Sequence, residues 1–402
     1  MTRTLLIPVA AALLVGCAAE ADTAAFRVEH LEDGTPVYIY ERLPEAAEVL
    51  ETDLTIGVGE GEDAYMFGDI RSVDADGAGN IYVLDAQAME VRTFDPSGVF
   101  LRTVAARGQG PGEITRANGM QVAGDTAVWI QDHGKYLMTA VALDGSGELG
   151  TAPMPVRRYG YAWSGGLDER GSLWKTSSRN LDADAPMMPT QSGPISSEMM
   201  NQLVRRDLAT GTQDTLELAT QRGQTYAMIR SNGYAMYGVP FSPGWSVAVA
   251  PNGDIWHVQT SAYRLARLSP TADTLLIIQV NRSGEPVTEQ DRQEVRDRMA
   301  EAGDEQAIVG AELAALMPEQ KPVLFGLRVD DSGRVWVRVG SDPEAPARFD
   351  IFEPDGTFVR SVELEAETLP YLHPAFRENR VYGISTDSLG APVVFRTRAM
   401  GG

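Results

Sequence analysis

Arginine and tyrosine residues gather in a few stretches of this 402-residue chain. Guanidinium groups make paired hydrogen bonds to carboxylates and phosphates, and tyrosine rings stack on sugars or peptides. In a chain with a net charge of −22, arginines brought together would suit a carboxylated or phosphorylated ligand. Each arginine could instead pair with an acidic residue, and each tyrosine could simply pack. The candidate ligand-binding residues are Arg107, Arg158, Tyr161, Tyr226, Arg230, Tyr234, Tyr237 and Arg282.

Histidines and acidic residues could do a second kind of chemistry, metal binding. His133, His257 and His373 fall in alternate repeats of the chain, but at different positions within the repeat, so they do not predict a symmetric metal site. Residues 74–79 and 330–333 place aspartates beside glycines but lack the downstream acidic ligand of a calcium loop, which favours hairpin turns. No cofactor is predicted, although a divalent metal in a central channel stays an alternative.

The motifs of common enzymes are absent: the chain has no Gly-x-Ser-x-Gly, His-Glu-x-x-His or Cys-x-x-Cys sequence. The alternating glycines of residues 107–114 are similar to those of a phosphate loop, but no amphipathic helix follows, so a turn is favoured over nucleotide binding. The acidic composition would repel phosphate backbones, which argues against nucleic acid as a partner.

The first 17 residues are typical of a bacterial lipoprotein signal. Arg3 precedes an apolar stretch at 5–15 that is too short to span a bilayer, and Cys17, the only cysteine, follows a small-residue cleavage site. The alternative is an ordinary secretory peptide cut a few residues later. Acylation of Cys17 would anchor the chain in the cell envelope, with Ala18 matching lipoproteins of the outer membrane. Residues 18–44 are then predicted to be a tether, with one strand at 36–40.

A repeat indicates the fold that must position these residues. An aliphatic residue followed by a large aromatic comes after a turn signal six times, and the aromatics are Tyr82, Trp129, Trp174, Trp256, Trp336 and Tyr382. Three of their intervals are close to 46 residues, and two are nearly double. A period of about 40 to 50 residues with several strands per unit is typical of propeller blades.

The first repeat predicts a blade of four antiparallel strands, at 69–74, 80–85, 91–95 and 99–104. The sixth repeat ends one strand short, while residues 50–57 precede the first repeat and are similar to its outer strand. We therefore expect the N-terminal strand to complete the last blade and close a six-bladed, all-β ring over residues 45–402. Closure protects the strand edges that an open sheet would leave free.

Three insertions account for the doubled intervals. Residues 180–202 are interpreted as an irregular loop, and residues 221–244 join blade three to blade four. Residues 282–322 are predicted to form two helices, at 288–299 and 305–317, with a capping box at Thr288 and Asp291. By propeller topology all three lie on one face, where they would form a lid, a binding rim or plain structural cover.

Residues 80–85, 95–98 and the Gly-Gln-Gly-Pro-Gly-Glu segment at 108–113 make the chain resemble the six-bladed propeller lipoproteins of bacteria, related to NHL-repeat proteins. The resemblance covers most of residues 50–400 and implies fold and periplasmic, membrane-anchored location rather than any activity. Two functions remain. The first is a binding module for a peptide, glycan or protein at the insertion-bearing mouth. The second is a metal-dependent hydrolase or lyase of the lactonase-like propeller type, which would need carboxylates converging on the axis.

Overall fold

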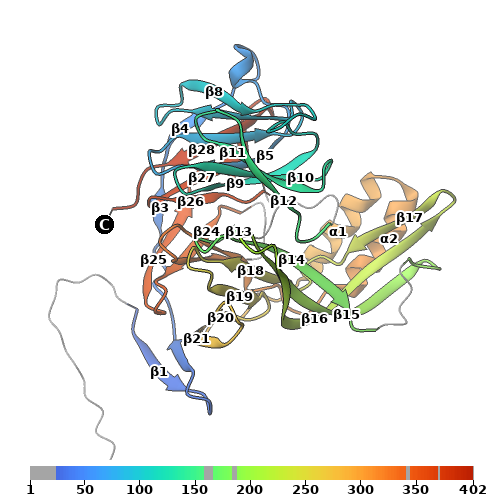
Figure 1. Ribbon diagram of the computed structural model, residues 1–402. Helices are drawn as coiled ribbons and strands as arrows, with labels where there is room; N and C mark the ends of the chain where they lie inside the picture. Colours follow the sequence, from blue (N-terminus) through green and yellow to red (C-terminus); the bar gives the residue numbers. More distant parts are fainter. Residues whose placement is uncertain (1–23, 158–165, 183–187, 341–344, 370–371, 402) are drawn as a thin grey trace, which may run out of the picture.

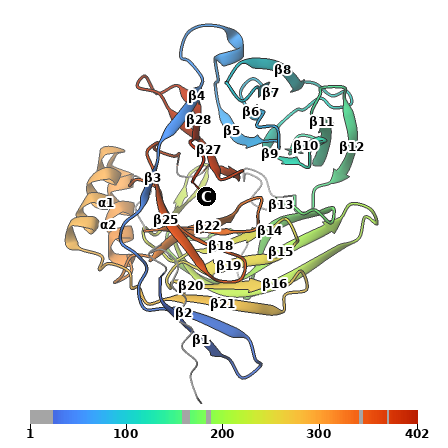
Figure 2. The ribbon, with the colours of Figure 1, turned by 90° about the vertical axis from the view of Figure 1, so that its left-hand side faces the viewer.

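The computed structural model describes residues 24–157, 166–182, 188–340, 345–369 and 372–401. Their strands form six antiparallel blade sheets, and Figure 2 shows these arranged as a ring around a central axis. The chain is the six-bladed β-propeller that the repeat predicts. Each blade runs from an inner strand on the axis to an outer strand at the rim.

The strands of the blades follow one another in chain order. Blade one contains β5 (Ile70–Ala75), β6 (Ile81–Asp85), β7 (Glu90–Phe94) and β8 (Phe100–Ala105), and blade two contains β9 (Ala117–Ala123), β10 (Ala127–Asp132), β11 (Leu137–Ala142) and β12 (Glu148–Pro153). Blade three contains β13 (Gly166–Leu167), β14 (Ser172–Asn180), β15 (Gly193–Asp207), β16 (Gln213–Arg230) and β17 (Gly233–Gly238). Blade four contains β18 (Trp245–Val249), β19 (Ile255–Gln259), β20 (Arg264–Leu268) and β21 (Thr274–Val280). Blade five contains β22 (Leu324–Val329), β23 (Val335–Val339), β24 (Arg348–Phe352) and β25 (Phe358–Leu364), and blade six contains β26 (Ala375–Arg377), β27 (Arg380–Thr386) and β28 (Pro392–Thr397).

The repeated aromatics lie on the second strand of each blade, as predicted. Five are buried, whereas Trp129 is half-buried. Side chains from neighbouring blades pack face to face: Tyr82 and Leu84 of blade one share a cluster with Val128 and Ile130 of blade two. This burial between sheets supplies the main stabilisation of the ring.

Aspartate caps the hairpin between the first and second strands in blades one, three and five. In blade three, Asp168 Oδ1 accepts hydrogen bonds from the backbone of Arg170 and Ser172, and its Oδ2 accepts one from Trp174 Nε1 at 2.8 Å. Asp76 and Asp330 make the equivalent contacts in blades one and five. Two of the carboxylates that look like calcium ligands in sequence, Asp76 and Asp330, therefore bind their own turns and aromatics.

The N-terminal segment adds a strand to each of three blades. β4 (Thr52–Ile56) pairs antiparallel with β28 and completes blade six, which confirms the predicted closure. β3 (Glu48–Leu50) pairs parallel with β25 of blade five, and β2 (Pro36–Tyr40) pairs parallel with β21 of blade four. β1 (Phe26–His30) forms a hairpin with β2 at the outer edge.

The strand expected at 36–40 is β2, but it is part of the ring rather than of a free tether. The reason is that Tyr40 is fully buried and hydrogen-bonded. Its hydroxyl donates to Gly356 O at 2.8 Å and accepts from Phe358 N at 2.9 Å. These contacts tie the segment to blade five as well as to blade four. The predicted tether therefore begins to pack on the propeller at β1.

Blade three extends into a structure that we call the arm: residues 193–202 of β15, residues 219–230 of β16, and β17. The interpretation of residues 180–202 as an irregular loop is wrong for the part from Gly193 on, because that part pairs with β16. The sequence gives little sign of this, since Ser, Met and Pro dominate the segment and its partner lies beyond a distant turn.

Helices α1 (Glu289–Glu301) and α2 (Asp304–Leu316) occupy the third insertion, as predicted, and the capping box at Thr288 and Asp291 is present. Val309 and Leu313 of α2 share a buried cluster with Tyr226 of the arm and with Val239, which follows it. Figure 1 shows the arm and both helices on the same side of the ring. No helix in the described ranges is long and apolar enough to cross a membrane.

Candidate functional site

A cavity of about 420 Å³ lies on the axis and is lined by the inner strands of all six blades. It is open because several inner-strand residues that face it are small: Ser72, Gly166, Ala248 and Ala375. Inner strands of a propeller bring side chains from distant parts of the chain to one place, so the polar groups of this cavity form the candidate site. We call the end at the first-to-second-strand turns the hairpin end.

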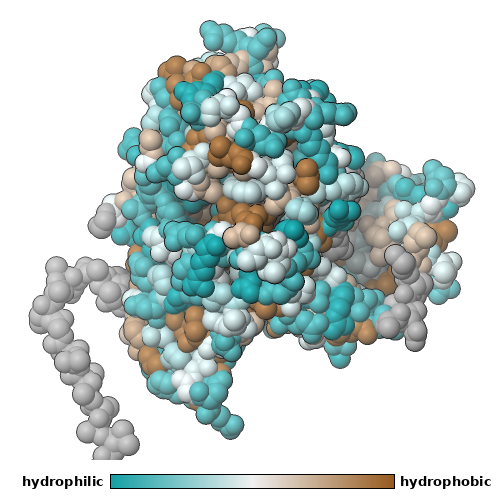
Figure 3. Space-filling model, in the orientation of Figure 1, coloured by the Kyte–Doolittle hydropathy of each residue, from teal (hydrophilic) through white to brown (hydrophobic). Residues whose placement is uncertain are grey.

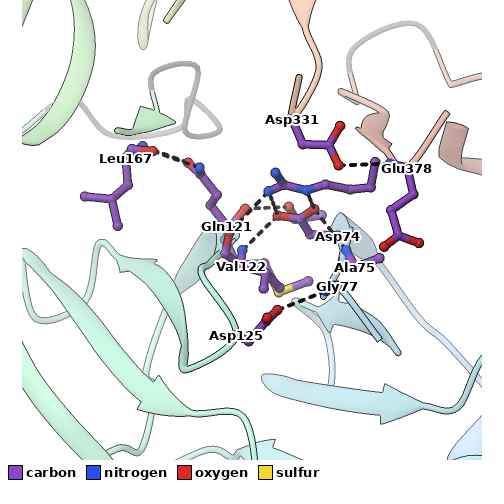
Figure 4. A network of polar contacts seen from close by, with 12 residues as sticks. Asp74, Ala75, Gly77, Gln121, Val122, Asp125, Leu167, Asp331 and Glu378 are labelled. Atoms are coloured by element: carbon purple, nitrogen blue, oxygen red, sulfur yellow. Dashed lines mark hydrogen bonds and ion pairs between the residues drawn. The ribbon is translucent and has the colours of Figure 1, made fainter. Parts of the chain in front are cut away.

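A buried ion pair crosses the cavity near its hairpin end (Figure 4). Asp74 of β5 is 3% exposed and accepts hydrogen bonds from Arg377 Nε at 2.8 Å and Nη2 at 2.9 Å. The second carboxylate oxygen also accepts from Val122 N at 2.8 Å. The Asp74 carboxylate raises the pKa of Arg377 above its ordinary value. One pair thus joins blades one, two and six.

Three further contacts join neighbouring blades at this end. Gln121 of blade two accepts from Leu167 N at 2.8 Å and donates to Leu167 O at 3.1 Å in blade three. Asp125 accepts from Gly77 N, which joins blade two to blade one. Asp331 of blade five accepts from Glu378 N of blade six. Figure 4 shows these side chains converging from separate strands, so the hairpin end of the cavity is held in place.

Arg328 of β22 reaches into the same cavity from blade five and differs from Arg377 in its partners. Its Nη1 donates to Leu327 O at 2.6 Å, and its Nη2 contacts Nδ1 of His373. Among the described residues, Arg328 has no carboxylate partner. Burial and the charge of Arg338 lower the pKa of Arg328 to about 10. The guanidinium still carries its positive charge at neutral pH.

His373 lies just before β26 and is held as a neutral acceptor. The charge of Arg328 is the largest cause that lowers the pKa of His373 well below its ordinary value, followed by burial and the charge of Lys175. A neutral imidazole can accept a hydrogen bond from Arg328 at the ring nitrogen that carries no proton. His373 therefore fixes the guanidinium without neutralising its charge.

Lys175 of β14 contributes a second positive charge close to this pair. It is 3% exposed, and burial lowers the pKa of its ammonium group to about 8. Its Nζ donates to Gln131 Oε1 at 3.1 Å, and the amide of Gln131 contacts His133 Nε2 at 2.7 Å. Arg328 and Lys175 therefore place two positive charges near His373, although carboxylates outnumber arginines in the lining of the cavity as a whole.

The sequence-predicted site residues do not form a single group. Arg158 and Tyr161 lie outside the described residues. Arg107 donates to Gln87 O within blade one, and Arg282 is exposed at the start of the helical insertion. The remaining four lie together on the arm: Tyr226, Arg230, Tyr234 and Tyr237.

The four arm residues have different environments. Tyr226 is buried against α2, so its ring supports the arm. Arg230 donates to the hydroxyl of Tyr237 at 3.1 Å, and its Nε lies 3.7 Å from Glu305. Tyr234 is 45% exposed, which leaves it able to contact a partner. The arm is thus a possible contact surface separate from the channel.

Sequence reasoning missed Arg328, Lys175 and the pairing of His373 with Arg328. The signal that could have found Arg328 is its register: it pairs with Trp336, as Asp74 pairs with Tyr82 and Gln121 with Trp129. Residues opposite the repeated aromatic face the axis, so aligning the repeats on the inner strand would have placed them together. Within the described ranges, no group of three or more His, Cys, Asp or Glu side chains is arranged to hold a metal ion.

Comparison with known proteins supports the fold. The DUF5128 family model, described as a 6-bladed beta-propeller, matches residues 60–139. No curated protein matches the sequence.

Among solved structures, a protein of Bacteroides fragilis described as exported is similar at 10% identity with a TM-score of 0.46, covering 88% of this chain and 99% of that one. A virginiamycin B lyase of Staphylococcus aureus is similar at 9% identity with a TM-score of 0.40, covering 86% of this chain and 98% of that one. A gluconolactonase of Xanthomonas campestris is similar at 13% identity with a TM-score of 0.38, covering 83% of this chain and 87% of that one. At these values the likenesses carry no inference about activity.

Proposed function

We propose that this chain is an extracytoplasmic, membrane-tethered binding module whose ligand enters the channel from the face that carries the arm and helices. The main support for this proposal is the cavity of about 420 Å³ on the axis, which is lined by charged groups from several blades. A propeller core is otherwise closely packed, and a cavity with a few convergent polar groups is the usual form of a small-molecule site.

Binding is favoured over catalysis because the most deeply buried carboxylates of the cavity already have partners. Asp74 binds Arg377 and the backbone of Val122. Asp168 and Asp330 hold their hairpins and tryptophans. A general acid or base needs a group within hydrogen-bonding reach of the substrate, and these carboxylates are committed elsewhere.

The insertion-bearing face offers a second surface to a peptide, glycan or protein partner. Tyr234 and Met236 of β17 are each 45% exposed, and Ile229 of β16 lies beside them. Aromatic and methionine side chains are common anchors in protein interfaces. Figure 3 shows hydrophobic residues interspersed among hydrophilic ones on the visible side of the molecule. In this proposal the arm orients a partner while the channel holds the ligand.

Tethering through a lipid on Cys17 forms part of the proposal, with the outer membrane as the expected location. Cys17 is the only cysteine of the chain, so a Cys17→Ser variant tests lipidation without affecting any disulfide. Labelled palmitate should be incorporated by the wild-type chain and not by the variant, and the variant should leave the membrane fraction. Equal labelling of both chains would contradict the anchor.

A channel-filling variant tests the binding function. Ala248 lines the cavity, so Ala248→Trp should fill it, and Thr274→Trp on the exposed rim of the same blade is the matched control. Melting temperatures are measured with a library of carboxylic acids, phosphates, sugars and short peptides. We expect compounds that stabilise the wild type and Thr274→Trp but not Ala248→Trp. Compounds that stabilise all three proteins equally would place the site elsewhere.

The proposal includes no resident cofactor, and elemental analysis tests this. The protein is purified without added metal or chelator and its metal content is measured by mass spectrometry. A stoichiometric divalent metal would favour the alternative of a metal-dependent hydrolase or lyase. A folded protein that contains substoichiometric metal would favour the binding module.

A further inference from the structure

We infer that the channel ligand carries an oxyanion group, a carboxylate or a phosphate, and that Arg328 binds this group. The inference rests on the proposed function, because it assigns the chemistry of the same cavity. It concerns a residue that the resemblance to propeller lipoproteins does not single out.

The first argument is the hydrogen-bonding capacity of Arg328. A guanidinium has five N–H donors in a fixed plane, and it matches a carboxylate or phosphate through two parallel hydrogen bonds. Arg328 lines the cavity and uses donors on Nη1 for Leu327 O and on Nη2 for His373. The contacts of Arg328 with described residues leave further donors, including its Nε–H, for a ligand.

The second argument is charge. The carboxylate of Asp74 compensates the charge of Arg377. Other arginines of the ring also form ion pairs with carboxylates, as Arg334 does with Asp330 and Arg360 with Glu48. No carboxylate among the described residues pairs with Arg328, although the chain has 56 acidic residues against 34 basic ones. A positive charge kept in a polar cavity without a counter-charge is the usual form of an anion site.

The third argument is the role of His373 as a positioning residue. Its neutral ring accepts from Arg328 and holds the guanidinium in one orientation, which lowers the entropy lost on binding. A carboxylate in the place of His373 would cancel the charge that attracts the anion.

The distribution of acidic residues indicates the direction of entry. Asp125, Glu169, Asp331 and Glu378 surround the hairpin end of the cavity. An anion approaching that end would meet four carboxylates and the Asp74–Arg377 pair. The lining residues place the cavity toward this hairpin end, so an anion would either pass these carboxylates or enter from the opposite, insertion-bearing face, which we infer to be the entrance.

Isothermal titration of the full mature chain with citrate, inorganic phosphate and uncharged glucose tests the inference. We expect one oxyanion to bind and Arg328→Gln to weaken it at least tenfold, about 1.4 kcal/mol. Arg360→Gln, in the same blade, is the control and should bind as the wild type does. Arg328→Lys keeps the charge and should bind more tightly than Arg328→Gln. Each variant is first compared with the wild type by its melting curve.

A pair of substitutions at His373 separates positioning from general structural support. His373→Gln keeps an acceptor and should bind within about threefold of the wild type, whereas His373→Leu removes the acceptor and should bind at least tenfold more weakly. Equal affinities for both variants and the wild type would remove the positioning role. Equal oxyanion affinities for Arg328→Gln and the wild type would overturn the whole inference.

The outcomes distinguish this inference from the proposed function. If only neutral compounds bind, and the Ala248→Trp variant loses them, the channel is a binding site but the oxyanion inference is wrong. If oxyanions bind the Ala248→Trp variant as tightly as the wild type, both ideas fail, because the anion then binds outside the channel.

Discussion

Removal of the positive partner from the buried ion pair should destabilise the propeller strongly. In Arg377→Met the side chain keeps its approximate length but loses both hydrogen bonds to Asp74. Asp74 is 3% exposed, so its charge would be left in the protein with only backbone donors. Breaking a buried pair in this way costs about 3–5 kcal/mol of unfolding free energy.

Removal of the negative partner should lower the unfolding free energy by less. Asp74→Asn keeps an oxygen that can accept from Val122 N, and the Arg377 side chain is 22% exposed and can reach water. We expect a loss of about 1–3 kcal/mol. Because the two residues bind each other, the double variant should lose less than the sum of the single variants, by about 1–3 kcal/mol.

Urea unfolding followed by tryptophan fluorescence measures all four proteins of this cycle. A loss below about 1 kcal/mol for Arg377→Met, or strictly additive single effects, would refute the view that this pair holds blades one, two and six together.

Three further predictions concern other contacts of the ring. Tyr40→Phe should lower the unfolding free energy by about 1–3 kcal/mol in urea, because the hydroxyl bonds to Gly356 and Phe358 are lost; Tyr38→Phe is the control and should have little effect. Trp174→Phe should cost about 1–2 kcal/mol more than Trp256→Phe in the same assay, because Asp168 accepts from Trp174 Nε1, whereas Trp256 Nε1 has no acceptor among the described residues; equal costs would contradict this role of Asp168. Folding lowers the pKa of Lys175 from 10.5 to about 8, so between these pH values the unfolded chain holds a proton that the folded chain does not. The unfolding free energy of the wild type should therefore rise by up to about 3 kcal/mol relative to Lys175→Met as the pH rises through this window. Parallel curves of unfolding free energy against pH for the two proteins would contradict this prediction.

The parts of the fold that sequence predicted are those governed by local chemistry. Glycine and aspartate before an aliphatic–aromatic pair fix a hairpin within a few residues, as at Gly79, where φ is 81°. The capping box at Thr288 and Asp291 likewise specifies a helix start within four residues. Such signals are complete in the sequence, so the blades and both helices could be predicted.

The arm and the site depended on partners far away in the chain. Residues 193–202 become a strand only because β16 extends alongside them, and their own composition does not favour a strand. Arg328, His373 and Lys175 come from three blades, and their proximity follows from the register of each inner strand against its neighbour. Clustering inferred from residue type alone therefore selected the arm residues and missed the channel.

The three N-terminal strands have a consequence for the order in which the molecule can be assembled. Residues 26–56 are synthesised before any of the blades, but β2, β3 and β4 pair with strands of blades four, five and six. Asp53 meets Arg396 across 343 residues of chain. β4 therefore cannot pair until β28, close to the end of the chain, has been made. The ring consequently cannot close before its last blade has been made, which puts the pairing of widely separated strands at the end of folding.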